Sequence, residues 1–399
     1  MSSTSVDISG LRLTLLEQPG AHTAGAVLRI GAGSADDRAP SFGAAHLAEH
    51  LRIAAGPPGP ASMPPVRGVT DNTGTTFSAV CLAEDAPALG ARLAALLGTS
   101  ELPADTVEAE RQAVLVELRQ AAGQPLLALG PAVAAAACPG HGLAATGWAD
   151  PASVARLDPA QVHAFTDRHY RRENAELVLA GAGLAIDRIL AAVDAAARPG
   201  AGTSVAATAD AATSVAATAT ATGAPNHQPA VPNHEPAAPD DEPAAPALAA
   251  ELDGLVVLSL VRGPERTDHC AALLGRQGTA EAAAARLGHP VLGRTAVAGR
   301  GVAVELLCWR AGSDTPALAA ALARESAELW SAAARPEALA RAGLQRRQDA
   351  GYRAWTPLGA AAALLDRSRV PSAPRVLPPA GPHSLALWRV ERGALRRHA

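Results

Sequence analysis

Two hydrophobic periods follow one another along the first half of the chain, and together they predict a mixture of strands and helices. Apolar residues at every second position predict four strands, over residues 11–16, 26–30, 75–82 and 175–180. Apolar residues at three- and four-residue spacing predict five helices, over residues 41–53, 86–97, 105–121, 159–170 and 186–197. The first two strands are expected to be neighbours joined through Gly20.

A stretch with neither period separates this part of the chain from a second one. Residues 199–250 contain Ala-Thr repeats and then Pro-Asn-His-Glu-Pro and Pro-Asp-Asp-Glu-Pro units. Such a composition buries too little apolar surface to offset the entropy of ordering, so this segment is expected to be a disordered or polyproline-like linker. The predicted elements beyond it are strands over 254–261 and 302–309, then helices over 316–334 and 336–355.

The recurrence of this element order predicts an α+β fold with an internal duplication. We expect an N-terminal domain over residues 1–198, the linker over 199–250, and a related, shortened C-terminal domain over 251–399. Each half should be a mainly antiparallel β-sheet covered by helices.

Composition and charge exclude several classes of function. The 399 residues carry a formal net charge of −4, so nothing predicts a nucleic-acid partner. No apolar run approaches the length of about eighteen residues that a membrane span needs, and the N-terminus has no basic region followed by an apolar one. The four cysteines are scattered, as is typical of a reducing compartment. A cytoplasmic protein without membrane contact is therefore expected.

The predicted helix over 41–53 carries the spacing of a metal site. His46 and His50 are four residues apart, so on a helix their imidazoles lie on one face, one turn apart. Two such rings can bind one Zn²⁺ ion at about 2.0–2.1 Å. Glu49, at the edge of the same face, could serve as the base that takes a proton from an activated water. The alternative is an amphipathic helix whose histidines fill polar gaps.

A third ligand must come from elsewhere, because a catalytic zinc takes three protein ligands and keeps one position open. The predicted helix over 105–121 offers Glu110 and Glu117, which are two turns apart and share a face. Glu117 lies among apolar residues, where a carboxylate needs a partner. The spacing also permits ordinary solvated carboxylates on a surface helix.

These motifs resemble those of the inverted-motif zinc metallopeptidases, family M16, which includes insulinase, pitrilysin and mitochondrial processing peptidase, here in a short bacterial subunit form. The resemblance begins with His-x-x-Glu-His at residues 46–50 and Glu-Arg-x-Ala-Val-x-x-Glu-Leu at 110–118. Asp-Asn-Thr-Gly-Thr at 71–75 resembles the family's Asn-Ala-x-Thr strand start, and Asn-Ala-x-Leu-Val at 174–178 resembles a later strand. The likeness covers most of residues 10–197.

The resemblance implies roles for these residues. Glu117 would be the third zinc ligand, and Glu110 a catalytic-site carboxylate that orients the ligands. Asn72 and Thr73 would bind substrate, with the strand that follows them offering its edge to an extended peptide.

The sequence also departs from the family pattern. The interval from His50 to Glu117 is shorter than in the family, and a proline-rich loop within residues 54–68 replaces an expected helix. In the second half, Arg294 matches a substrate-binding arginine, but Gly301 stands where the family has a tyrosine. A homologous partner subunit that supplies this Arg/Tyr pair is therefore expected, in a heterodimer, with a homodimer as the alternative.

Taken with the resemblance, the sequence predicts a zinc-dependent endopeptidase subunit that closes with a second chain into a clamshell. Its substrates would be peptides or unfolded segments, and it could be a leader or processing peptidase. Two alternatives stay open, namely a catalytically silent structural subunit and a non-enzymatic peptide-binding clamshell.

Overall fold

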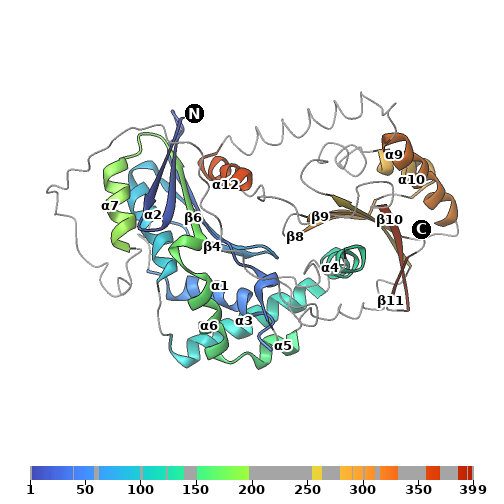
Figure 1. Ribbon diagram of the computed structural model, residues 1–399, viewed down its shortest axis with the longest axis horizontal. Coiled ribbons are helices and arrows are strands. Elements are labelled where there is room, and N and C mark those ends of the chain that lie inside the picture. Colours follow the sequence, from blue (N-terminus) through green and yellow to red (C-terminus); the bar gives the residue numbers. More distant parts are fainter. Residues whose placement is uncertain are drawn as a thin grey trace.

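Two β-sheets lie at the centres of the two halves of the chain (Figure 1). The first has six strands in the order β1-β2-β6-β3-β5-β4, and the second has five in the order β11-β10-β7-β9-β8. The computed structural model describes residues 2–38, 40–57, 63–98, 102–122, 125–138, 151–196, 254–262, 279–289, 291–299, 302–310, 315–330, 356–368, 385–392 and 394–397.

Strand β6 lies at the centre of the first sheet. It is parallel to β2, whereas every other pairing in this sheet is antiparallel. Because β6 lies between β2 and β3, the expectation that these two strands are neighbours is wrong. The reason is burial, since residues 177–180 of β6 are apolar and fully buried, which suits a central strand covered on both faces. The strands are β1 (Ser2–Ile8), β2 (Leu11–Glu17), β3 (Thr23–Ile30), β4 (Arg67–Thr70), β5 (Thr75–Leu82) and β6 (Ala175–Gly181).

Helices from the first half cover one face of this sheet and share a single core with it. Leu13, Leu28, Phe77 and Leu177 point into that core from four strands, and Leu47 enters it from α1. The alternation of apolar and polar residues along β2 and β5 is what directs these side chains to one face. The helices of this half are α1 (Ala44–Ala55), α2 (Ala86–Ala94), α3 (Ala104–Ala122), α4 (Pro125–Ala137), α5 (Pro151–Arg156), α6 (Pro159–His169) and α7 (Ile186–Ala196).

The second sheet is antiparallel throughout. Helices α9 and α10 of this half pack against each other. The elements here are β7 (Leu255–Arg262), α9 (Thr279–Arg286), β8 (Gly293–Gly299), β9 (Val302–Arg310), α10 (Thr315–Trp330), α12 (Pro357–Ser368), β10 (Leu385–Glu391) and β11 (Ala394–Arg397).

Each sheet is also covered by a helix from the other half of the chain (Figure 1). Helix α4 packs against β7, β8 and β9 of the second sheet, and its Leu129 and Val133 are buried in the core that the helix shares with this sheet. Helix α12 packs against β3, β5 and β6 of the first sheet, and its Ala361 and Leu365 are buried in the core that the helix shares with this sheet. It comes so close to β3 that a side chain at Gly25 would overlap the α12 backbone. The two sheets therefore depend on each other for the burial of their apolar faces.

The predicted α+β class, with two mainly antiparallel sheets covered by helices, is confirmed. Closure with a second chain stays a prediction, as do the domain boundaries. The predicted linker and the predicted helix over 336–355 lie outside the described residues. Among the residues that are described, no helix has the length and apolar character needed to cross a membrane.

Candidate metal centre

The start of α1 is fixed by a buried carboxylate. Asp37 Oδ2 accepts the backbone N–H of Gly43 at 2.7 Å, and its Oδ1 accepts that of Ala45 at 2.9 Å. Gly43 has φ 94°, a left-handed conformation that favours glycine. Burial raises the pKa of Asp37 to about 8, although the two backbone hydrogen bonds oppose this rise. Asp37 thus sets where the helix begins and so where its histidines lie.

The three predicted ligands, His46, His50 and Glu117, meet between α1 and α3. His46 Nε2 lies 3.4 Å from Glu117 Oε2, and His50 Nε2 lies 3.6 Å from Glu117 Oε1. The ligand atoms of all three residues lie within 4.8 Å of one another. Tetrahedral zinc with bonds of about 2.0–2.1 Å separates its ligand atoms by about 3.3–3.4 Å. Two imidazoles and one carboxylate at these separations therefore fit a catalytic zinc ion.

Glu110 contacts the other nitrogen of one histidine. Its Oε2 lies 3.2 Å from His50 Nδ1, on the opposite side of the ring from Glu117. Such a carboxylate fixes the tautomer in which Nδ1 carries the hydrogen and Nε2 is left to bind a metal. The structure therefore brings Glu110 and Glu117 to the same imidazole, as the shared helical face of these two glutamates predicts.

Glu49 lies beside the histidines and is almost completely buried. Thr70 Oγ1 donates a hydrogen bond of 2.6 Å to Glu49 Oε2. Burial raises the pKa of Glu49, while the hydrogen bond from Thr70 and the nearby His50 oppose that rise. A buried carboxylate next to a candidate metal site is placed to exchange protons with a molecule bound there.

These side chains line a cleft of about 440 Å³, which is within the range of about 300–1,000 Å³ typical of ligand sites. Helices α1 and α3 form two of its walls and strand β4 forms the third. Its lining residues are His46, Glu49, His50, Ile53, Ala54, Gly68, Val69, Thr70, Glu110 and Glu117.

Asn72 and Thr73 lie in the turn between β4 and β5 and do not line this cleft. Asn72 is buried, and its Oδ1 accepts a hydrogen bond from the Ser34 hydroxyl at 3.2 Å. Thr73 donates to Asp71 Oδ1 through its backbone N–H and its hydroxyl. Both side chains hold the turn, and their substrate-binding role stays a prediction.

The strand that follows Asn72 was expected to offer a free edge, and this expectation is wrong. Strand β5 pairs with β3 on one side and with β4 on the other. Among the described residues, the edge strand on this side of the sheet is β4, which the hydrophobic pattern did not predict. An Asp-Asn-Thr-Gly turn flanked by Thr70 and Thr75 is a hairpin signal that could have revealed it.

Arg294 lies far along the chain, in β8, where it is opposite Leu307 of β9. Its backbone is part of a strand that the sequence analysis did not predict. Its substrate-binding role stays a prediction, and Gly301 lies outside the described residues.

Comparison with curated proteins gives relatives that are described as zinc proteases. No family model matches the sequence. Over 183 residues the chain is 31% identical to a curated Mycobacterium bovis protein described as an uncharacterized zinc protease. That match spans 44% of this chain and 41% of the relative, so it covers about two fifths of the relative's length.

Solved structures extend the likeness to nearly the whole chain. An M16-like peptidase from Alicyclobacillus acidocaldarius superposes with a TM-score of 0.61 at 17% identity, over 92% of this chain and 94% of that one. The inactive domain of a Pseudomonas fluorescens M16 peptidase gives a TM-score of 0.64 at 16% identity, over 93% and 88%. At such identities the likeness shows the fold alone. The chain has the fold of the M16 peptidases and is similar to curated zinc proteases, which confirms its resemblance to the inverted-motif zinc metallopeptidases.

Proposed function

We propose that the chain is a zinc-dependent endopeptidase subunit, with zinc held by His46, His50 and Glu117. The observation that carries this proposal is the meeting of these three side chains at zinc-ligand separations between α1 and α3, which form two walls of a cleft. A zinc ion bound there would polarise a substrate carbonyl and activate a water molecule.

The remaining residues of the site have separate roles in this proposal. Glu49 takes a proton from the attacking water and returns one to the leaving amine, a role supported by its burial and its place in the cleft. Glu110 keeps His50 in the metal-binding tautomer. The exposed edge of β4 pairs with the backbone of an extended peptide, which gives affinity with little demand on sequence. Asn72 and Thr73, in the turn that follows β4, are the proposed substrate-binding residues beside this edge.

The assembly is part of the same proposal. A related partner chain supplies an arginine and a tyrosine across an enclosed chamber, because Gly301 stands where a tyrosine is expected. Peptides and unfolded segments enter such a chamber, which suits a leader or processing peptidase. A homodimer that uses Arg294 is the alternative. Buried thiols at Cys81 and Cys308 support a reducing, cytoplasmic location.

The experiment is to measure zinc content, mass and peptide hydrolysis of the purified chain, alone and with a related chain. Glu49→Gln should keep about one zinc per chain and lose about 10²–10⁴-fold in turnover, because it removes the base and no ligand. His46→Ala should lose the zinc. If the chain alone is a homodimer that hydrolyses peptide at the full rate, the heterodimer proposal is wrong. If the chain binds peptide but no zinc, it is a peptide-binding module and not a zinc peptidase.

A further inference from the structure

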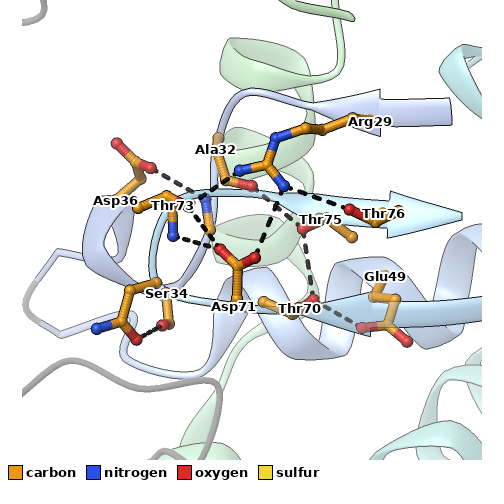
Figure 2. A network of polar contacts seen from close by, with 12 residues as sticks. Arg29, Ala32, Ser34, Asp36, Glu49, Thr70, Asp71, Thr73, Thr75 and Thr76 are labelled. Atoms are coloured by element: carbon orange, nitrogen blue, oxygen red, sulfur yellow. Dashed lines mark hydrogen bonds and ion pairs between the residues drawn. The ribbon is translucent and has the colours of Figure 1, made fainter. Parts of the chain in front are cut away.

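One side chain reaches the catalytic glutamate from outside the two helices of the site. Thr70 is the last residue of β4, and its hydroxyl donates to Glu49 Oε2 at 2.6 Å (Figure 2). Glu49 belongs to α1, so the two residues come from different elements of the fold. The contact therefore joins the edge strand of the sheet to the helix that carries the histidines.

The direction of this hydrogen bond is set by its surroundings. Thr75, directly opposite Thr70 in the β4–β5 hairpin, is fully buried and donates its hydroxyl to the carbonyl oxygen of Ala32 at 3.1 Å. The two threonine hydroxyl oxygens are 3.4 Å apart. With the hydrogen of Thr75 directed at Ala32, the single hydrogen of Thr70 is left for a carboxylate, which can only accept. A charge-assisted bond of this length is a strong one.

The backbone of β4 confines the same carboxylate from a second side. Gly68 precedes Thr70 by two residues, so both face α1 from the same side of the strand. A Cβ atom at Gly68 would overlap Oε1 and the carboxyl carbon of Glu49. Glu49 is thus held by the Thr70 hydroxyl on one oxygen and by the close approach of the Gly68 backbone near the other.

The hairpin that presents Thr70 is itself braced. Arg29 of β3 lies 3.6 Å from Asp71 Oδ2 and donates to the Thr73 hydroxyl at 3.0 Å (Figure 2). Asp71 in turn accepts from Thr73, which closes the turn directly after Thr70. The position of the Thr70 hydroxyl therefore depends on the sheet and not on a mobile side chain alone.

From these contacts we infer that Thr70 is a positioning residue for the proposed peptidase reaction. Its hydroxyl fixes Glu49 through Oε2 and leaves Oε1 as the oxygen that exchanges protons. The inference rests on the proposed function for its kinetic consequence, but not for the geometry. Because the edge of β4 is also the proposed binding site of the substrate backbone, one strand positions both the substrate and Glu49.

The test compares Thr70→Val, Thr70→Ser and the control Thr76→Val. Valine keeps the shape of threonine without its hydroxyl, and serine keeps the hydroxyl. Thr76 is on the neighbouring strand, and its hydroxyl accepts from Arg29 at 3.3 Å rather than bonding Glu49. Because it removes a hydrogen bond to a charged group, Thr70→Val should lower kcat about 10- to 100-fold, which corresponds to about 1.4–2.7 kcal/mol. KM and zinc content should change less than twofold, and Thr70→Ser and Thr76→Val should stay near the parent.

Crystal structures of the same variants give a readout that does not depend on activity. Glu49 should keep one conformation in the parent chain and in Thr70→Ser, and should turn away from it in Thr70→Val. If Thr70→Val leaves Glu49 in place and hydrolysis within twofold, Thr70 does not position the base. If the parent chain binds no zinc and cleaves no peptide, the proposed function fails, while the position of Glu49 in the valine variant still decides the role of Thr70.

Discussion

Removing the carboxylate of Glu110 should weaken zinc binding without removing a ligand. Its Oε2 lies 3.2 Å from His50 Nδ1, and the side chain is 29% exposed, so the contact is partly shielded from water. Loss of such a partner typically lowers metal affinity about 10- to 100-fold, which corresponds to about 1.4–2.7 kcal/mol. Glu110→Ala should fall in this range. Glu110→Gln should lose less, because its amide oxygen still accepts the Nδ1 hydrogen.

Competition with a chromophoric chelator at fixed pH and ionic strength measures these affinities directly. The matched control is Glu108→Gln on the same helix, where the carboxylate bonds Arg111 at 2.9 Å and Gln112 at 2.8 Å. The control should keep the zinc affinity of the parent. An unchanged zinc Kd in Glu110→Ala would show that Glu110 does not orient His50, and equal losses in both helix positions would point to a general weakening of α3.

Two further predictions concern stability in the zinc-free protein. Because burial raises the pKa of Asp37 from 3.8 to about 8, the folded chain holds a proton there that the unfolded chain has lost, so the free energy of unfolding should fall as the pH rises from about 4 to about 8. Asp37→Asn should flatten that fall in urea unfolding at pH 5 and 8, and an unchanged slope would contradict the assignment. Leu365→Ala in α12 should lower the free energy of unfolding by about 2–5 kcal/mol. The control Leu292→Ala, whose side chain is 53% exposed, should change it by about 0.5 kcal/mol or less; equal effects would show that α12 does not close the first sheet.

The sequence predicted the elements in which a regular apolar spacing continues over many consecutive residues. Helix α1 begins three residues later than expected, and β5 has the predicted bounds, because apolar spacing and the burial it directs agree there. For the same reason, the sequence predicted that the two histidines share one face of α1 and that the two glutamates share one face of α3. Residues one or two turns apart on a helix share a face whatever the rest of the fold does.

What the sequence left out depends on contacts between distant segments. The position of β6 between β2 and β3 cannot be predicted from the sequence of either strand. Likewise, the sequences of α4 and α12 do not indicate that each helix packs against the sheet of the other half. Helix α4 is apolar on all sides and carries Pro131, so it shows no amphipathic stripe. Strand β4 is four residues long and contains a glycine, which is too short a run for its alternation to be recognised.

This contrast separates the parts of the site that a motif can contain from those that it cannot. His46, Glu49 and His50 come from one helix, and their spacing alone predicts two of the proposed ligands and the proposed base. The hydroxyl that orients the base comes from Thr70, in a strand that was not predicted, through a hairpin braced by Arg29 from a third segment. An HxxEH helix therefore specifies which atoms can do the chemistry. Their exact placement is a property of the sheet edge beside it, and a chain that kept the motif but lost this edge would be expected to bind zinc and hydrolyse slowly.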